Sequence, residues 1–420
     1  MQTELAEFIR DTREGKEADA ILRKCVHCGF CTATCPTYQL LGDELDGPRG
    51  RIYLIKDMLE GAAVTARTQL HLDRCLTCRA CETTCPSGVQ YGRLVDIGRK
   101  LAEERVPRPL LPRLLRFALR AVLPRRALFA SLLGVGRWLR PVLPFALQHK
   151  IPAKVPAAGA WPAARHARRM LVLAGCVQPA LSPDINAASA RVLDRLGISL
   201  VEAPAAGCCG AVRFHLNAQE DGLADMRALI DAWWPYVEPA QGGAGAVEAI
   251  VMSASGCGVT VKEYGHLLAH DPAYAAKAEK ISALTKDLSE VIAAELERLQ
   301  PLLAKTAPPA EAKKLALQLP CTLQHGQKIT GVVERILVAA GFELTPVADS
   351  HLCCGSAGTY SILQPQLAAR LKANKLAALH AGSPQAIVSA NIGCLSHLQS
   401  GTALPMQHWI VALERRLAGV

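Results

Sequence analysis

Two cysteine runs with the same spacing constrain this 420-residue chain more than any other feature. Each run reads Cys-x2-Cys-x2-Cys-x3-Cys-Pro, and the members are Cys25, Cys28, Cys31, Cys35 and Pro36, then Cys75, Cys78, Cys81, Cys85 and Pro86. Zinc takes four ligands in all, and it has no use for two such compact runs, each followed by proline. A disulfide framework needs an oxidising compartment and is typical of small secreted domains. The doubled spacing therefore favours iron–sulfur clusters.

The run resembles the ligand motif of two-cluster bacterial ferredoxins, in which the fourth cysteine of each run ligates the other cluster. The resemblance implies a ferredoxin-like domain over residues 1–100 that holds two [4Fe–4S] clusters. The implied ligands are Cys25, Cys28, Cys31 and Cys85 for cluster 1, and Cys75, Cys78, Cys81 and Cys35 for cluster 2. Such clusters carry one electron at a time, so we expect an electron carrier and assign no catalytic residue.

The positive charge of the chain is concentrated in one segment. The net charge is +10, and residues 101–170 alone contain 12 Arg, 2 Lys and 2 Glu. Leucines and arginines fall on different helical faces between prolines, so residues 101–165 are predicted to form a basic amphipathic helical linker. Such a segment suits an anionic membrane surface or an acidic partner subunit, and a linker packed on the rest of the protein is the alternative. No recognised motif accompanies the charge, so nucleic acid is not expected as a partner.

The start of the chain predicts a cytoplasmic protein. Residues 1–7 lack a basic region followed by an apolar run, which a secretory signal would require. No uninterrupted apolar stretch reaches the roughly 18 residues that suggest a membrane-spanning helix. We therefore expect a cytoplasmic location, with peripheral contact to the inner face of the cell membrane as an extension of it.

Residues 166–420 contain an internal repeat marked by eight further cysteines. In each copy one cysteine precedes a Cys-Cys-Gly triplet by 32 positions, and another cysteine closes the copy. The members are Cys176, Cys208, Cys209 and Cys257 in residues 166–304, and Cys321, Cys353, Cys354 and Cys394 in residues 311–420. Stretches 238–245 and 305–310, rich in small residues and proline, are interpreted as an insertion and a linker between the copies.

Short apolar runs alternate with helical patterns in both copies. This alternation predicts βαβ units with a parallel sheet in each half. Cysteines that follow the strands should then converge at the carboxyl edge of each sheet. The predicted fold class is multi-domain α+β, with a mostly helical ferredoxin-like domain before a duplicated α/β cysteine-rich domain. Residues 4–22 are predicted to form one leading helix.

The Cys-Cys-Gly repeats resemble the cysteine-rich domain of heterodisulfide reductases. Behind a ferredoxin-like domain, that domain occurs in iron–sulfur subunits of flavin-dependent 2-hydroxyacid and glycerol-3-phosphate dehydrogenases. Segments 25–38 and 350–360 are similar to the glycolate-oxidising members. The resemblance implies an electron-transfer subunit of a glycolate dehydrogenase complex. Flavin would lie on partner flavoprotein subunits and not on this chain, and electrons would pass on to an acceptor such as a membrane quinone.

The repeats depart from that family at one position. In the resembling domain each copy closes with Cys-x2-Cys, whereas here Thr260 follows Cys257 and His397 follows Cys394 at that spacing. Imidazole can replace thiolate on iron, as it does in Rieske centres. The resemblance therefore implies a further iron–sulfur cluster on the second set with His397, while the first set lacks a fifth ligand. The alternative is that both sets are buried cysteines at strand ends.

Other functions remain open on the sequence alone. The chain could serve a D-lactate or glycerol-3-phosphate dehydrogenase, because the substrate pocket would lie on another chain. It could itself be catalytic in the manner of a heterodisulfide reductase, or a docking scaffold for flavin subunits. No strand-associated Gly-x-Gly-x-x-Gly fingerprint and no Gly-x-Ser-x-Gly elbow is present. We therefore expect the isolated chain not to be catalytic.

Overall fold

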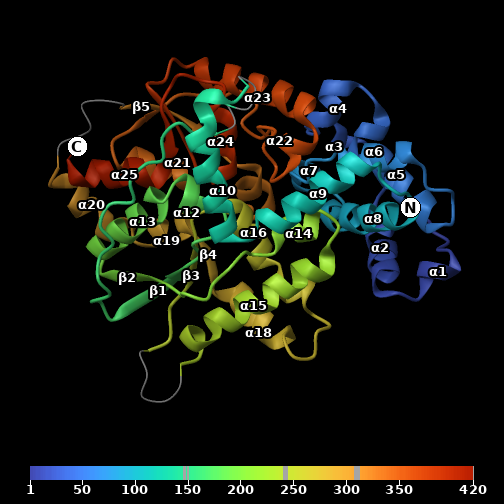
Figure 1. The fold of residues 1–420 in the computed structure, drawn as a ribbon, viewed down its shortest axis with the longest axis horizontal. Coiled ribbons are helices and arrows are strands. Elements are labelled where there is room, and N and C mark those ends of the chain that lie inside the picture. Colours follow the sequence, from blue (N-terminus) through green and yellow to red (C-terminus); the bar gives the residue numbers. More distant parts are fainter. Residues whose placement is uncertain (145–147, 149–150, 240–244, 307–312, 420) are drawn as a thin grey trace.

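A computed structural model describes residues 1–144, 148, 151–239, 245–306 and 313–419. The N-terminal part is helical and forms one end of the molecule, and the two cysteine-rich halves form the rest (Figure 1). The helices of the N-terminal part are α1 (Glu7–Arg10), α2 (Arg13–Lys24), α3 (Phe30–Ala33), α4 (Pro36–Leu41), η1 (Glu44–Asp46), α5 (Pro48–Leu59), α6 (Ala66–Asp73), α7 (Ala80–Thr84) and α8 (Tyr91–Arg105).

The prediction of one leading helix over residues 4–22 is wrong, because the chain breaks into α1 and α2. Thr12 caps α2, and its side chain accepts a hydrogen bond from the Gly15 backbone N–H at 3.0 Å. The break folds Ile9 back onto Gly15, where an added Cβ would lie 1.9 Å from the Ile9 carbonyl oxygen. Apolar side chains of α2, α5, α6 and α8 then meet in a core that includes the fully buried Leu22 and Leu94.

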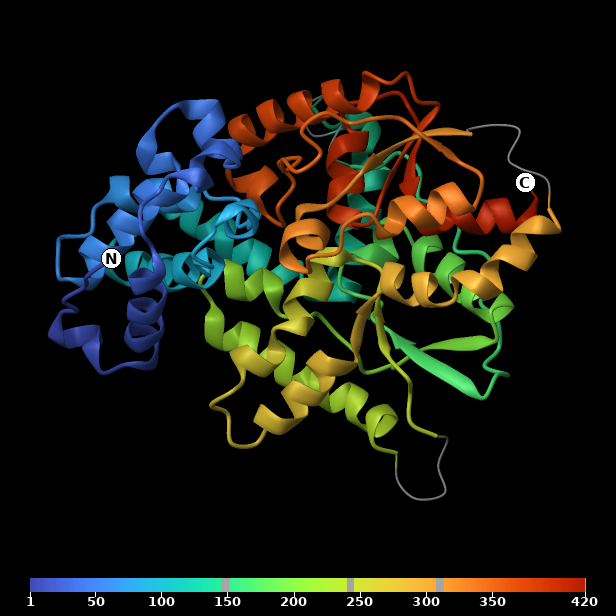
Figure 2. The same cartoon turned by 180° about the vertical axis from the view of Figure 1, so that it is seen from behind.

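The basic segment forms two helices after α8, whereas residues 151–165 of the predicted helical linker are not helical. The two helices are α9 (Leu110–Val122) and α10 (Arg126–Leu139), followed by the short turn η2 (Arg140–Val142). They cross the near face of the molecule in Figure 1 and lie behind the other elements in Figure 2, so both views place them on one side. Among the described residues, no helix combines the length and the apolar character needed to cross a membrane.

The two cysteine-rich halves have the same sheet topology. Strand order is β2-β1-β3-β4 in the first half and β6-β5-β7-β8 in the second, and every pairing is parallel. This confirms the predicted α/β repeat. The strands are β1 (Arg168–Val172), β2 (Ile198–Glu202), β3 (Ile250–Met252), β4 (Thr285–Asp287), β5 (Lys314–Gln318), β6 (Glu343–Leu344), β7 (Ala386–Ser389) and β8 (Met406–His408).

Helices cover both faces of each sheet, as parallel sheets require. The first half contributes α12 (Gln178–Leu181), α13 (Asp184–Arg195), α14 (Ala211–His215), α15 (Gln219–Val237), α16 (Ser255–Lys262), α17 (Tyr264–Leu267), α18 (Ala275–Leu284), α19 (Leu288–Ala294) and α20 (Leu296–Ala304). The second half contributes the π-helical turn η3 (Thr322–Gly326), α21 (Val332–Ala339), α22 (Tyr360–Leu363), α23 (Pro365–His380), α24 (Ile392–Gln399) and α25 (Trp409–Ala418).

The two halves share one hydrophobic core. Val172 and Val251 of the first sheet belong to the same buried cluster as Leu315, Val388 and Trp409 of the second half. Polar contacts reinforce this seam. The buried His408 ring donates from Nε2 to the Ser253 carbonyl oxygen at 3.0 Å and accepts at Nδ1 from the Ile410 N–H at 3.3 Å.

This histidine should make the fold sensitive to acid. Burial lowers the pKa of His408 to about 3, against about 6.5 in an unfolded chain. The unfolded state therefore binds more protons between these values, and the stabilisation is present above pH 6.5 and lost as the pH falls toward 3. Acidification from pH 7 to pH 5 should therefore lower the free energy of unfolding by about 2 kcal/mol through this one ring.

Chemical unfolding of wild type and the His408→Gln variant at both pH values measures this contribution. Glutamine can still donate to the Ser253 carbonyl but does not titrate, so the variant should lose less stability on acidification than wild type. His380→Gln, at an exposed site on α23, is the matched control. Equal acid sensitivity of wild type and His408→Gln would contradict the assignment.

Some predicted features lie partly outside the described residues. Most of the insertion at 238–245 and of the linker at 305–310 falls there. The domain boundaries themselves stay predictions, and α8 passes through the first of them, at residue 100.

Candidate functional site: two four-thiol cavities and two further cysteine sets

The first cavity collects cysteines from both runs. Cys25, Cys28 and Cys31 line it together with Cys85, the fourth cysteine of the second run. The loop that carries the first three turns through left-handed backbone at His27 (φ 54°) and Gly29 (φ 83°). This path brings three thiols of one short segment to a single wall, and Cys85 closes the cavity from the other side.

The second cavity repeats the arrangement with the runs exchanged. Cys75, Cys78 and Cys81 line it together with Cys35, the fourth cysteine of the first run. Thr77 (φ 52°) and Arg79 (φ 62°) take the left-handed conformations that His27 and Gly29 take in the first run. Arg99 fixes this loop, since its guanidinium donates to the Thr77 hydroxyl at 2.9 Å and to the Cys75 carbonyl.

The donor set of each cavity fits a cubane iron–sulfur cluster. Three cysteines of one run and the fourth cysteine of the other line each space, Cys81 also lines the first, and all sixteen cysteines of the chain are free. Burial raises the pKa of the Cys31 thiol to about 11 and moves the pKa of Cys78 and Cys81 well above the ordinary value. Without a bound cation these thiols would stay protonated, whereas bound iron would stabilise the thiolates. The cavities are neighbours, because Pro48, Cys81 and Tyr91 line both.

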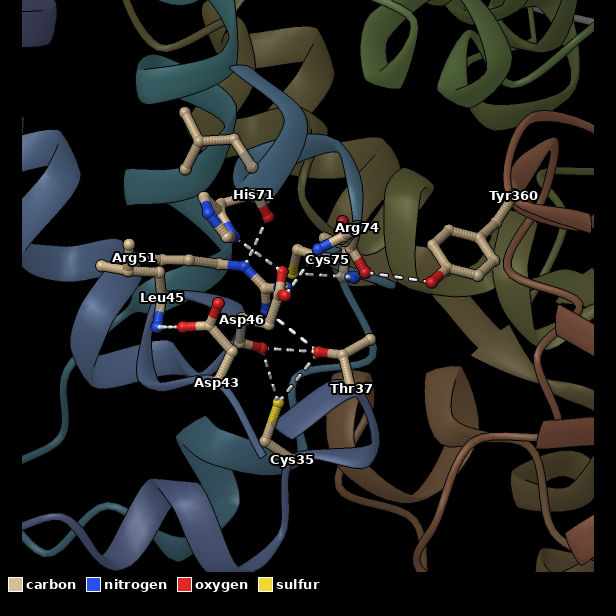
Figure 3. Close-up of polar contacts among 12 residues, drawn as sticks. Cys35, Thr37, Asp43, Leu45, Asp46, Arg51, His71, Arg74, Cys75 and Tyr360 are labelled. Atoms are coloured by element: carbon tan, nitrogen blue, oxygen red, sulfur yellow. Dashed lines mark hydrogen bonds and ion pairs between the residues drawn. The ribbon is translucent and has the colours of Figure 1, made fainter. Parts of the chain in front are cut away.

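A buried cation stands beside the second cavity (Figure 3). The Arg51 side chain is 1% exposed and lines this cavity. Its guanidinium donates to the His71 carbonyl at 2.7 Å and to the Thr37 hydroxyl at 3.2 Å. Burial opposes the charge, but the neighbouring Cys75, Tyr91 and Cys35 raise the pKa of Arg51 above its ordinary value. The guanidinium therefore stays a cation next to two of the cavity's cysteines.

Asp46 balances this cation and links it to a second one. Its carboxylate, 0% exposed, lies 3.4 Å from an Arg51 nitrogen and accepts from Arg74 at 2.8 Å and from His71 Nδ1 at 3.0 Å. The network reaches a predicted ligand directly, since the Thr37 hydroxyl lies 3.3 Å from the Cys35 sulfur. The positions of Asp46 and His71 carry no spacing signal, so the sequence alone does not identify them as part of this site.

The second repeat gathers its four cysteines at the carboxyl edge of its sheet. Cys321 follows β5, the Cys353-Cys354 pair follows β6 and Cys394 follows β7. The sulfurs of Cys321 and Cys353 are 3.9 Å apart, and Cys354 contacts both Cys353 and Cys394. Gly355 takes φ 88°, and a Cβ there would lie 2.8 Å from the Ala368 carbonyl oxygen, so glycine is required after the pair.

The His397 side chain lies beside this set. Its ring contacts the backbone of Cys354 and Ala368, and burial lowers its pKa to about 4. Nε2 is buried and has no hydrogen-bond partner among the described residues. A neutral imidazole with an unused nitrogen has the chemistry of a metal ligand.

The second set also adjoins the ferredoxin-like part. Cys321 and Cys353 pack in one cluster with Leu76 and Cys78 of the second run. The Tyr360 hydroxyl donates to the Arg74 carbonyl at 3.1 Å across the same contact. The second cysteine set therefore lies against the wall of the second cavity.

The first repeat has the same cysteine arrangement in different surroundings. Cys176 contacts Cys208, and Cys209 contacts both Cys208 and Cys257. Hydrogen bonds from Cys176 and Cys209 lower the pKa of Cys208. The hydrogen bond with Cys208, together with burial, raises the pKa of Cys176. Cys209 and Cys257 pack inside the first half, with Trp233 and Tyr264.

The position equivalent to His397 in the first repeat carries no comparable ligand. Thr260 stands there, and its hydroxyl donates to the Gly256 carbonyl of its own helix at 3.2 Å. Helix α16 therefore uses this side chain internally. The two sets thus differ both in the residue at the fifth position and in the residues that pack around their cysteines.

Comparisons with known proteins agree with this layout. The 4Fe-4S dicluster domain family matches residues 21–89, and the cysteine-rich domain family matches residues 170–262 and 315–399. The glycolate oxidase iron-sulfur subunit of Escherichia coli K12 is 58% identical over 417 residues, which cover 99% of both chains. The probable glycolate oxidase iron-sulfur subunit of Bacillus subtilis 168 is 29% identical, over 95% of this chain and 93% of that protein.

A third relative is shorter. Lactate utilization protein A of Bacillus licheniformis is 24% identical over 53% of this chain and 87% of its own length. The first similarity extends over both the cysteine runs and the two repeats. The chain belongs to the family of glycolate oxidase iron–sulfur subunits.

Proposed function

We propose that the chain transfers electrons within a complex that dehydrogenates glycolate to glyoxylate. The observation that carries this proposal is the pair of four-thiol cavities with a common wall at Pro48, Cys81 and Tyr91. Two one-electron carriers held there would be close neighbours. The relative of 58% identity supports glycolate as the substrate of the complex, and the more distant lactate utilization relatives make D-lactate the second candidate.

Residues of this chain would hold and tune the carriers. When bound, two [4Fe–4S] clusters would supply the one-electron steps of the relay. Cys25, Cys28, Cys31 and Cys85 are proposed to hold cluster 1, and Cys75, Cys78, Cys81 and Cys35 to hold cluster 2. Arg51 would offset negative charge at the second cavity. Flavin on partner flavoprotein subunits would deliver the electrons, and a membrane quinone is the proposed acceptor.

The test distinguishes electron transfer by this chain from oxidation of glycolate by the flavoprotein partners. The anaerobically purified, iron-loaded chain should not reduce an artificial dye with glycolate, because it supplies no hydride acceptor. Addition of the flavoprotein partners should restore glycolate-dependent reduction of its iron–sulfur absorbance. Turnover by the isolated chain would refute the division of labour, and a failure of reduced partners to bleach the chain would refute the relay.

We further propose that the second cysteine set holds one additional iron–sulfur cluster. Support comes from the buried His397 Nε2 that has no partner among the described residues, and from the packing of Cys321 and Cys353 against Cys78. Electrons that leave the second cavity would then have an adjacent destination. Cys209 and Cys257 of the first set pack with residues of their own half, and Thr260 stands at the fifth position, so this set is the weaker candidate.

Iron analysis of matched variants tests the additional cluster. A chain with three clusters should contain about twelve irons, and a chain with two about eight. Cys353→Ser should remove about four irons, whereas Cys208→Ser, the same position of the first repeat, should leave the iron content unchanged. About eight irons in wild type, unaffected by Cys353→Ser, would show that the set is structural.

A further inference from the structure

Helices α9 and α10 turn an apolar surface outward. Ten of the eighteen exposed large apolar side chains of the described residues fall between positions 110 and 142. We call them the apolar face. Its members are Leu110, Leu111, Leu114, Leu115 and Phe117 from α9, Leu128, Leu132, Val135 and Trp138 from α10, and Val142 after it. Large apolar side chains exposed in this number on one segment mark a site of contact.

Helix α9 exposes apolar side chains and buries a charged one, the reverse of what is usual for a helix that packs on the body of its own protein. Leu110, Leu114 and Phe117 recur at i, i+4 and i+7, so they share one face, and they are 68%, 52% and 63% exposed. The charged Arg116 instead points inward, is 8% exposed, and lies 3.1 Å from an Asp73 carboxylate oxygen. The body of the protein thus buries Arg116 and Leu119 of α9 and leaves its other leucines and Phe117 partly or largely exposed.

Helix α10 is more exposed still. None of its fourteen residues is buried, although Leu128, Leu132 and Val135 repeat at helical spacing and Trp138 is 79% exposed. The transfer of each such side chain out of water would lower the free energy of the system. Both helices lie on the same side of the molecule in Figures 1 and 2, so one surface can cover them together.

The charge around this face identifies the surface that fits it. No aspartate or glutamate occurs between Arg105 and Pro183. Arg113, Arg126 and Arg137 are exposed, and among the described residues no ion pair with a carboxylate is found for any of them. Cations beside an apolar helical face are the composition of helices that lie in the headgroup region of an anionic bilayer.

The dimensions and the aromatic residue agree with binding along the surface. At about 1.5 Å per residue, α9 and α10 are each about 20 Å long, shorter than the roughly 30 Å hydrocarbon core. Trp138, near the end of α10, is of the residue type that prefers the headgroup level. An acidic protein would match the arginines but would not need nine exposed large apolar side chains across two helices.

We propose that α9 and α10 form a membrane-binding surface that inserts its apolar face into the outer part of a bilayer rich in anionic lipid. The exposed arginines bind the phosphate headgroups, and Arg116 with Asp73 anchors α9 to the body of the protein. This surface would keep the relay next to a lipid-soluble acceptor, and in that respect it extends the proposed function. The binding itself requires neither glycolate nor a partner chain.

Co-sedimentation of the full iron-loaded chain with vesicles tests the proposal. At about 0.1 M salt, wild type should bind vesicles of phosphatidylcholine with phosphatidylglycerol and bind pure phosphatidylcholine at least tenfold more weakly. The triple variant Arg113→Gln/Arg126→Gln/Arg137→Gln should bind anionic vesicles about 100-fold more weakly than wild type. The double variant Phe117→Ser/Trp138→Ser should lose about tenfold or more in binding.

The matched control is Val338→Ser on α21, which removes an equally exposed apolar side chain (58%) outside the apolar face and should bind as wild type does. Brominated lipid should quench Trp138, and Trp138→Phe should bind normally while losing that quenching. Wild type that stays in the supernatant, or equal binding of Phe117→Ser/Trp138→Ser, would overturn the proposal. So would burial of the face against a flavoprotein partner in the absence of lipid. Failure of vesicle binding with intact electron transfer would count against this surface alone, not against the relay.

Discussion

Replacing Cys85 by serine is expected to disturb the cluster of the first run, although Cys85 belongs to the second. The structure places Cys85 with Cys25, Cys28 and Cys31 around one cavity. The iron content should fall by about four per chain, which is the content of one [4Fe–4S] cluster. Glycolate-dependent turnover of the complex should be almost abolished, because the relay would lose one of its carriers.

Electron paramagnetic resonance of the reduced variants measures which cluster is affected. The residual signal of Cys85→Ser should match that of Cys25→Ser. The signals of Cys35→Ser and Cys75→Ser should match each other and differ from the first pair. If each run held its own cluster, Cys85→Ser would instead give the spectrum of Cys75→Ser.

Replacing Arg51 by methionine should destabilise the ferredoxin-like part and lower the potential of the cluster in the second cavity. Removing one partner of a buried ion pair costs about 3–5 kcal/mol. We expect the lower end, because Arg74 would still bind Asp46. The potential should fall because reduction adds negative charge, and the buried guanidinium lies beside Cys35 and Cys75.

Two measurements with matched controls separate these effects. Arg49→Met removes a cation that lines the first cavity and whose pair with Glu44 is partly exposed, at 37% and 40%, so it should cost less than about 1 kcal/mol and leave the potential of the second cluster nearly unchanged. In a redox titration followed by paramagnetic resonance, Arg51→Lys should keep most of the wild-type potential, whereas Arg51→Met should not. Equal stabilities and potentials for Arg49→Met and Arg51→Met would contradict the role of the buried charge.

The cysteine pattern predicts which residues line the cavities, because each run is short and its spacing is the same in both copies. Strand order and the position of cysteines after strands are likewise predictable, since alternating apolar runs and helices leave few topologies. The Asp46–His71 contact is not predictable, because it joins positions that are 25 residues apart with no periodic relation. The inward turn of Arg116 depends on Asp73 on another helix, so the sequence reveals an amphipathic α9 but not which side faces water.

The predicted leading helix shows that sequence patterns can also fail over a short range. Residues 4–22 have helical propensity throughout, and the single prediction fails at Thr12 because a side-chain cap ends one helix and begins another. A difference of this kind is small in free energy and local in space. The surroundings of the two Cys-Cys-Gly sets, by contrast, depend on how the halves dock, and no short segment of sequence carries that information.

The common core of the two cysteine-rich halves has a consequence for how this protein can change over evolutionary time. Val172 and Trp409 belong to one apolar interior, and His408 joins the halves through Ser253. If the first half has given up a cofactor, it cannot be deleted, because the second half would expose its interior to water. Mutations can therefore remove the ligands of one repeat while selection for solubility preserves its fold. The result would be a functional protein that retains one inactive site.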